Sequence, residues 1–515
     1  MSARPITRRS LLAASAGVIA GGLLRPRSAL ALLSGPSAPT LTERWLGQLS
    51  PAGVSVELRQ PVDLVGLEWR APARARVWLR FRGRQGPWSS WVSAAANGHG
   101  PEARAASDRQ VGEPIWTGGA TSVQIRAPQA LSGVRLHLVD VGGAQPPTLG
   151  GYAAALSGGM ALATPILAAG PGQPPIIARR AWAHAVAKPK VAPEYGAVRM
   201  AFVHHTENPN GYAASEVPSM LRAIYAFHRY VNGWDDIGYN FVVDLYGRIF
   251  EARAGGIDEP VVGAQAGGYN LASTGIAVLG SFMATPISSA ARRALQALLA
   301  WKLALHGVPA QGSVIVRVNP AGASYSRFPA NARVPLPRIA GHRNADATDC
   351  PGNVLYGELP AIRRAVQRLA PNPTRATLAL AAAAPAPAAA PGAPSPTPAT
   401  PATPATPATP ATPGVPETQV LSGVLELLDG TPVSGAPILI QVRSVSRKGE
   451  AVSEQTLAET RTDSAGSWAL TATPVAPASG GMWLRALCPG AARVGACVSE
   501  PLHVPVTLSL AAPPA

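Results

Sequence analysis

Proline at every third position sets the strongest limit on how this chain can fold. The triplet Pro-Ala-Thr recurs from Pro398 to Thr412, inside a stretch over 371–416 with few residues able to form a core. Proline fixes its own φ and has no amide hydrogen, so such a repeat favours an extended polyproline spacer. We therefore expect a multidomain protein with a Pro/Ala/Thr-rich linker over 371–416.

A second stretch, 143–175, is rich in Gly, Ala and Pro and is predicted to be another linker. The 515 residues are too many for one ordinary domain, and 47% of them are hydrophobic, which is enough for several cores. Only 14% are charged, while Pro and Gly number 53 and 52. This composition is typical of globular domains joined by Pro-rich connectors.

The N-terminus carries an export signal. Thr7-Arg8-Arg9-Ser10-Leu11-Leu12 is a twin-arginine pattern, an uncharged stretch follows, and Ala29-Leu30-Ala31 is a small-x-small cleavage site. We interpret 1–31 as a twin-arginine signal peptide, with a retained N-terminal anchor as the alternative. The protein is then exported to the cell wall or beyond, and the mature chain is expected to have no transmembrane segment.

The formal net charge of +16 favours an anionic partner. Anionic cell-wall polymers fit this charge. No run of Lys and Arg is interleaved with aromatic residues, so we expect no nucleic-acid partner.

Residues 45–142 are predicted to form a small antiparallel β domain. Val77, Leu79 and Phe81 alternate with arginines, which is the pattern of a half-buried strand. Four tryptophans of this region fill its core or, alternatively, line a sugar-binding face. They are Trp78, Trp88, Trp91 and Trp116.

Residues 176–370 are predicted to form an α/β domain with a mixed β-sheet and flanking helices. A strand is expected over 199–205, a helix that Ser215 caps, and a hairpin around Tyr246-Gly247. Ser288 is expected to cap a long helix, and a last helix is expected over 355–369.

Residues 417–510 alternate again, as in 438–442, and are predicted to form a β-sandwich. Short pieces over 433–437 and 462–466 resemble immunoglobulin-like or carboxypeptidase-regulatory modules. Outside the cytoplasm, Cys488 and Cys497 favour a disulfide over two free buried thiols.

Two distant segments of the chain contain side chains that can bind a metal. One contains His204 and His205, and the other contains His342 and the remaining cysteine, Cys350. Imidazole and thiolate are ligands that tetrahedral zinc prefers, and three protein ligands leave a fourth position for water. Neighbours on a strand point to opposite faces, so only one of His204 and His205 can serve one site. The spacing itself is not that of a zinc finger, and a lone strand histidine is more often structural.

Four motifs that occur in a fixed order along the chain favour a metal site over structural histidines. They are Phe202-Val203-His204-His205-Thr206, Trp234-Asp235-Asp236-Ile237-Gly238-Tyr239-Asn240-Phe241, Gly263-Ala264 with Gly268-Tyr269-Asn270, and Gly341-His342-Arg343 through Cys350-Pro351-Gly352. With them, residues 176–370 resemble the peptidoglycan-recognition protein and phage-lysozyme type of zinc N-acetylmuramoyl-L-alanine amidase, the amidase type 2 family. The signal, β domain and Pro-rich tail resemble the arrangement of exported actinobacterial amidases.

The resemblance implies a Zn²⁺ cofactor and hydrolysis of the amide between N-acetylmuramic acid and L-alanine in peptidoglycan (EC 3.5.1.28). It implies zinc ligands at His204, His342 and Cys350, with His205 as second choice, and a catalytic tyrosine at Tyr239. Thr348 stands where the phage enzymes have lysine, and we expect its hydroxyl to contact the substrate carbonyl. Gln265 stands where many relatives have histidine, which puts a substrate contact in doubt. The alternatives are a non-catalytic peptidoglycan-binding module and a wall adhesion factor built on the flanking β domains.

Overall fold

The computed structural model describes residues 38–70, 75–94, 99–100, 109–142, 172–370, 373–376, 379–382, 419–445, 452–490 and 495–511. The predicted signal peptide over 1–31 and most of both predicted linkers lie outside these residues. Among the described residues, no helix combines the length and the apolar character needed to cross a membrane.

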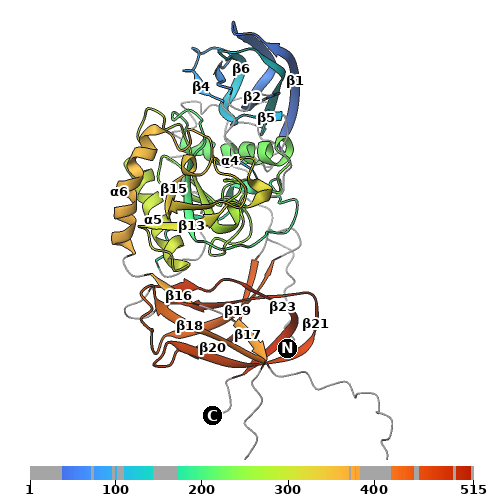
Figure 1. Ribbon diagram of the computed structural model, residues 1–515. Helices are drawn as coiled ribbons and strands as arrows, with labels where there is room; N and C mark the ends of the chain where they lie inside the picture. Colours follow the sequence, from blue (N-terminus) through green and yellow to red (C-terminus); the bar gives the residue numbers. More distant parts are fainter. Residues whose placement is uncertain are drawn as a thin grey trace, which may run out of the picture. The chain divides into compact units, whose positions relative to one another are not determined.

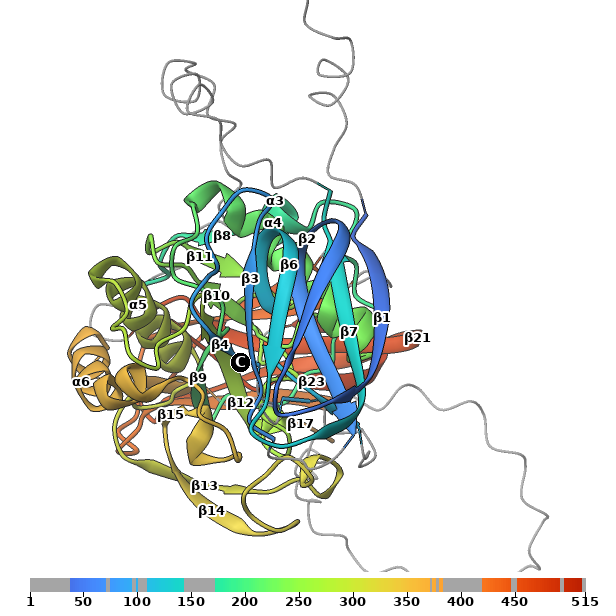
Figure 2. The same cartoon turned by 90° about the horizontal axis from the view of Figure 1, so that it is seen from above.

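The N-terminal sheet has seven strands, and every pair of neighbours in it is antiparallel, as the alternation predicts. Its order is β1-β7-β2-β6-β3-β4, with β5 paired to β2 (Figure 2). The strands are β1 (Thr40–Leu49), β2 (Val54–Arg70), β3 (Trp78–Arg82), β4 (Val92–Ser93), β5 (Arg109–Val111), β6 (Ile115–Arg126) and β7 (Leu131–Asp140). Val77 and Leu79 are buried in its core.

The four tryptophans of this domain divide between two environments. Trp116 is 5% exposed and belongs to an apolar cluster. The other three are half-buried and alternate with guanidinium groups 4.1–5.6 Å from their ring centroids. This ladder consists of Trp78, Trp88, Trp91, Arg80, Arg82 and Arg126. Trp116 is thus buried against the middle domain and not in the core of its own sheet, whereas the other three lie at the surface of the sheet.

The middle domain is built on a mixed sheet, which confirms the prediction for this segment. Its order is β15-β9-β12-β10-β11-β8; the β10–β11 hairpin is antiparallel and the other described pairs are parallel. The strands are β8 (Ile176–Ile177), β9 (Met200–His205), β10 (Phe241–Val243), β11 (Ile249–Glu251), β12 (Ser273–Val278) and β15 (Ile339–Gly341). A separate antiparallel pair is formed by β13 (Ser313–Arg317) and β14 (Arg333–Pro337).

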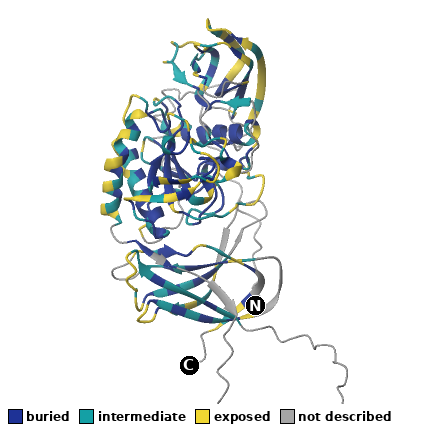
Figure 3. Ribbon diagram, in the orientation of Figure 1, coloured by how far each residue is buried: buried dark blue, intermediate teal, exposed yellow. Residues whose placement is uncertain are grey.

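Helices cover both faces of this sheet (Figures 1 and 3). α5 (Ser289–Leu305) and α6 (Asn353–Leu369) share an apolar cluster with one face. α3 (Arg180–Ala183) and α4 (Val217–Ala226), which runs on into a π turn at Phe227–Val231, share another cluster with the opposite face. Short 3-10 turns lie at Ala214–Glu216, Asn270–Ala272, Pro320–Gly322 and His342–Asn344.

One helix cap is as predicted and one is not. The Ser288 hydroxyl accepts a hydrogen bond of 3.0 Å from the Ala291 amide at the start of α5. Ser215 does not cap α4, because a 3-10 turn precedes that helix. Glu216 closes this turn instead, its carboxylate accepting from the Ala213 amide at 2.6 Å.

The N-terminal sheet packs directly on α4 and its π turn. Leu64 and Val139 of this sheet share the apolar cluster of α4. Gly66 faces Phe227 so closely that a Cβ on this glycine would lie 1.9 Å from the ring. Arg109 adds a hydrogen bond of 3.2 Å to the Val231 carbonyl. A side chain at position 66 would therefore separate the two domains.

The C-terminal sheet begins earlier than predicted. β16 (Thr374–Ala376) and β17 (Ala379–Ala382) pair with β18 (Gln419–Leu427), so residues assigned to the linker over 371–416 are strands. Short strands of this kind form because β18 offers them a partner. The other strands are β19 (Pro437–Val445), β20 (Val452–Arg461), β21 (Ser467–Cys488), β22 (Cys497–Val498) and β23 (Leu502–Ala511).

Cys488 and Cys497 face each other across β21 and β22 as free, buried thiols. The structure thus does not contain the disulfide that the sequence favours. The same sheet contacts the middle domain, since Arg485 forms ion pairs with Glu259 at 2.7 Å and Asp258 at 2.5 Å.

Candidate metal centre

The end of β9 separates two adjacent histidines onto opposite faces of the sheet. His204 lies opposite Ala277 in the register with β12, on the face that packs toward α4. His205 lies opposite Val278, on the face toward α5, and its Nε2 is 2.9 Å from Glu207. Strand alternation therefore places His204 at the centre described below and excludes His205 from it.

The next strand of the sheet, β15, ends at Gly341, so His342 emerges beside His204. Both His342 and Asp346 have no exposed surface, and the Nε2 of this histidine lies 2.7 Å from a carboxylate oxygen of Asp346. Asp346 is thus a buried partner of His342. It holds the proton of His342 on Nε2 and leaves Nδ1 as the nitrogen without a hydrogen-bond partner.

Cys350 reaches the same point from the loop that follows. Arg343 holds this loop, since its amide and side chain donate to the Cys350 carbonyl at 3.0 and 3.4 Å. The amide of Cys350 donates to the Thr348 hydroxyl at 3.1 Å. The cysteine sulfur accepts from the His205 amide at 3.4 Å and lies 3.6 Å from Nδ1 of His204.

Gln265 fixes the orientation of His204. Its Oε1 is 2.6 Å from His204 Nε2, and its own amide group donates to the Ser273 hydroxyl at 3.0 Å. Gln265 has no exposed surface, so it is a positioning residue behind the histidine. With Nε2 protonated toward Gln265, Nδ1 of His204 presents a lone pair to the centre.

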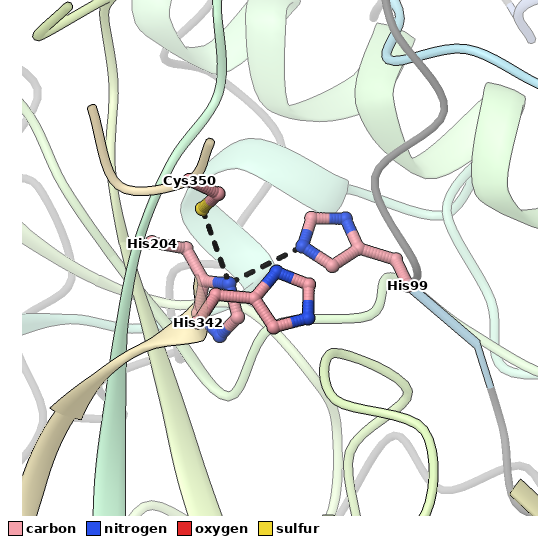
Figure 4. A group of neighbouring side chains, drawn as sticks. All are labelled: His99, His204, His342 and Cys350. Carbon is pink, nitrogen blue, oxygen red and sulfur yellow. Dashed lines mark hydrogen bonds between the residues drawn. The ribbon is translucent and has the colours of Figure 1, made fainter. Parts of the chain in front are cut away.

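The structure thus brings His204, His342 and Cys350 together, and it adds His99 from the N-terminal sheet domain (Figure 4). One possible ligand atom from each of the four lies within 4.8 Å of the others, and all four residues are buried. His99 stacks on His342 with ring centroids 4.5 Å apart.

This donor set fits zinc. Burial, followed by the neighbouring His99, holds the pKa of His204 and of His342 well below the usual histidine range, so both rings are neutral. Burial raises the pKa of the Cys350 thiol well above its usual range, so a thiolate there needs a cation beside it. Zinc–nitrogen and zinc–sulfur bonds of ~2.05 and ~2.3 Å at a tetrahedral angle give a nitrogen–sulfur edge of ~3.6 Å. The distance between Nδ1 of His204 and the cysteine sulfur is the same, 3.6 Å.

Tyr239 lies beside these ligands. Its ring centroid is 5.5 Å from those of His204 and His99, and it is 1% exposed. Its hydroxyl has no hydrogen-bond partner among the described residues. Burial, with Glu113, Cys350 and Glu207 adding to it, raises the pKa of this phenol well above its usual range. The hydroxyl is therefore a hydrogen-bond donor at neutral pH and not a base.

His99 had no signal in the sequence. It stands in Asn97-Gly98-His99-Gly100, 105 residues before His204 and outside every motif quoted above. Its place at the centre depends on how two domains pack, which residue spacing does not encode.

Comparison with known proteins finds relatives of two parts of this chain. Residues 194–353 match the family model described as N-acetylmuramoyl-L-alanine amidase, and residues 30–150 match one described as Rv3811 N-terminal galactose-binding domain-like. The human N-acetylmuramoyl-L-alanine amidase is 28% identical over 177 residues, which are 34% of this chain and 26% of that protein. Peptidoglycan-recognition protein SC2 of Drosophila melanogaster is 28% identical over 159 residues, 31% of this chain and 71% of that protein. The chain therefore spans about a quarter of the human relative.

Among solved structures, Drosophila PGRP-LB is 24% identical and covers 36% of this chain and 92% of its own, with a TM-score of 0.28. The endolysin amidase LysCS from Clostridium intestinale is 21% identical and covers 37% of this chain and 95% of its own, with a TM-score of 0.26. The middle segment of this chain, residues 194–353, is thus similar to N-acetylmuramoyl-L-alanine amidases and peptidoglycan-recognition proteins.

Proposed function

We propose that this chain is a zinc-dependent N-acetylmuramoyl-L-alanine amidase acting on bacterial peptidoglycan. The observation that carries the proposal is the convergence of His204, His342 and Cys350 in a domain of this family. Each of these side chains is held by a partner of its own, as the ligands of a working metal site are. When bound there, zinc supplies a Lewis acid and an activated water at neutral pH.

In this mechanism Tyr239 donates a hydrogen bond to the carbonyl oxygen of the scissile amide. Negative charge develops on that oxygen in the transition state, and a fixed donor stabilises it most in a site that excludes water. Tyr239 is suited to this role because its buried hydroxyl has no described partner and its raised pKa keeps it protonated.

Thr348 is proposed as a second contact to the same carbonyl. Its hydroxyl oxygen accepts from the Cys350 amide, which fixes the side chain next to a ligand. A neutral hydroxyl cannot supply the charge that a lysine would supply at this position. Most of the stabilisation of the developing charge is therefore assigned to the metal and Tyr239.

Replacing Tyr239 by Phe should lower kcat about a hundredfold, because one oxyanion donor typically contributes that much. The zinc content and KM should stay near the wild-type values, since the hydroxyl has no hydrogen bond to a ligand. Steady-state hydrolysis of a muramyl peptide and metal analysis of the same samples check this. Tyr246→Phe is the control, because its hydroxyl bonds to the Tyr212 carbonyl and its side chain is 49% exposed. An unchanged kcat in Tyr239→Phe would remove the tyrosine from the mechanism.

The proposed function is tested by removing the metal. Chelation of the purified chain should stop the release of peptides with N-terminal L-alanine from peptidoglycan, and one equivalent of Zn²⁺ should restore it. A chain that contains no zinc and binds peptidoglycan without cleaving it would instead be a recognition module. Mass spectrometry of the released peptides distinguishes amide cleavage from cleavage within the glycan.

We also propose that the protein works outside the cytoplasm. The twin-arginine pattern at Arg8-Arg9 and the cleavage site ending at Ala31 support export. The surface ladder of arginines and tryptophans on the N-terminal sheet supports contact with anionic wall polymers. N-terminal sequencing of extracellular protein tests the export proposal, and Leu32 is the expected first residue.

A further inference from the structure

One residue at the metal centre comes from outside the amidase domain. His99 lies between β4 and β5 of the N-terminal sheet, yet its ring is buried against His204 and His342 (Figure 4). It also contacts the ring of Tyr239. The backbone beside it is seated on the amidase domain. The Gly100 carbonyl accepts from the Asn270 side chain at 2.9 Å, and a Cβ on Gly100 would lie 2.5 Å from the Tyr325 ring.

Hydrogen bonding assigns the ring nitrogens of His99. Its Nδ1 lies 2.6 Å from a carboxylate oxygen of Glu113, which is 5% exposed. A carboxylate at this distance accepts a hydrogen bond from Nδ1, and the tautomer with its proton there carries its lone pair on Nε2, as a metal ligand must. A carboxylate behind a histidine is also the usual partner of a metal-binding imidazole.

The lone pair of His99 points at the lone pair of another histidine. Its Nε2 lies 3.2 Å from Nδ1 of His204, whose own proton is held on Nε2 by Gln265. The proton of His342 likewise lies on Nε2, which faces Asp346. The Nδ1 of His342 carries the lone pair and has no hydrogen-bond partner among the described residues. Three buried imidazoles with bare nitrogens and one cysteine sulfur thus surround a common point. Facing lone pairs repel each other unless a proton or a metal cation lies between them.

Two of the distances between possible ligand atoms match the edges of a zinc tetrahedron. Zinc–nitrogen bonds of ~2.05 Å at a tetrahedral angle place two ligand nitrogens ~3.3 Å apart. The His99–His204 separation is 3.2 Å, and the His204–Cys350 separation is 3.6 Å. His99 therefore occupies the corner that a three-ligand catalytic site leaves open for water.

We propose that His99 is a fourth protein ligand, supplied by the N-terminal domain, that closes the metal site and keeps the enzyme latent. Zinc sites with four protein ligands are structural, whereas catalytic sites keep one position for water or substrate. The proposal rests on the proposed function, because latency presupposes an amidase. Hydrolysis then requires His99 to leave the metal, so the rate is limited by the fraction of molecules in which it has left.

Domain packing holds His99 in place. Leu64 and Val139 bury apolar surface against α4, Gly66 fits against Phe227, and Trp116 donates to Glu216 at 3.4 Å. These contacts lie away from the metal centre, on the α4 side of the interface. Opening therefore involves movement of the His99 segment alone or of the whole N-terminal sheet.

The coordination is tested on the full chain with Co²⁺ in place of Zn²⁺, comparing the wild type with His99→Ala and His99→Gln. Azide should alter the visible spectrum of both variants, because an exchangeable position is open, and should leave the wild type unchanged. Zinc dissociation constants should rise at least about tenfold in the variants, since one of four ligands is lost. His503→Ala, an exposed histidine of the C-terminal sheet, is the control and should behave as wild type. Equal azide effects on the wild type and on the folded variants would overturn the proposal.

The rate of hydrolysis tests the proposal independently of the cobalt spectra. With zinc bound, His99→Ala and His99→Gln should hydrolyse muramyl peptides at least about tenfold faster than the wild type. Slower hydrolysis with a wild-type spectrum would make His99 a catalytic residue and overturn latency. Spectral differences without hydrolysis by any variant would keep His99 as a ligand and refute the amidase. Equal spectra with rapid wild-type hydrolysis would keep the amidase and refute the fourth ligand.

Discussion

Replacing Cys350 by Ser should reduce hydrolysis at least about a thousandfold and weaken zinc binding without unfolding the domain. Zinc prefers a thiolate to a hydroxyl, and a serine hydroxyl keeps its proton where the thiol would lose it beside the metal. The substitution preserves volume at a residue that is 1% exposed, so packing changes little. Metal analysis, hydrolysis of muramyl peptides and circular dichroism of the same preparation check the three parts of this expectation.

The zinc affinity of Cys350→Ser reports on the three histidines that remain in this variant. Three imidazoles, those of His99, His204 and His342, stay in place in Cys350→Ser, and three histidines can hold zinc. The position vacated by sulfur lies toward the Cys350 loop, which is held by Arg343. A water there is poorly placed for a substrate beside Tyr239. We therefore expect weakened zinc binding in Cys350→Ser, and loss of zinc on dialysis in the double variant with His99→Ala.

A matched control separates the metal effect from the loss of a buried thiol. Cys488→Ser makes the same change at a fully buried cysteine. This cysteine lies on β21, a strand that contributes no residue to the metal centre. This variant should keep wild-type zinc content and activity. Full activity in Cys350→Ser would show that the sulfur is not a ligand and would leave the three histidines as the site.

The sequence predicted the parts of this fold that local chemistry decides. The Ser288 cap, the hairpin at Tyr246-Gly247 and the opposite faces of His204 and His205 each depend on neighbours within a few residues. The motifs placed His204, His342 and Cys350 at one site, because each motif ends a strand or starts a loop at one end of the same sheet.

The features that the sequence did not predict depend on distant partners. Residues 374–382 are rich in alanine and look like part of a linker, yet β18 offers them an edge to pair with. The sequence left the role of Gln265 open, and the structure sets it by a hydrogen bond to His204, 61 residues away. His99 lies at the metal centre because the N-terminal sheet packs on the middle domain, where Gly66 contacts Phe227 and the Gly100 carbonyl accepts from Asn270.

A second large effect is expected at Asp236, in the segment that precedes Tyr239. This side chain is 2% exposed and forms an ion pair of 2.7 Å with Arg179. It also accepts from the amides of Ile237 at 2.8 Å and Ala254 at 3.0 Å. Arg179 is itself 8% exposed and donates to the carbonyls of Ala187 and Ala252.

Replacing Asp236 by Ala should destabilise the amidase domain by about 3–5 kcal/mol, the usual cost of breaking a buried ion pair from one side. The guanidinium of Arg179 would stay buried without its counter-charge, and two amides would lose their acceptor. Asp235→Ala is the control, because that neighbour is half-buried and its carboxylate has no described hydrogen bond. It should cost less than about 1 kcal/mol.

The chain has several domains, so a single unfolding transition is not a safe measure of this effect. Hydrogen exchange resolves it, because the amides of Ile237 and Ala254 are the ones that Asp236 holds. In Asp236→Ala these amides should exchange at least about a hundredfold faster, with the C-terminal sheet unchanged. Tyr239 follows this segment by three residues, so we also expect kcat to fall while zinc stays bound. Unchanged exchange at both amides would show that Arg179 and its other partners hold the segment without the carboxylate.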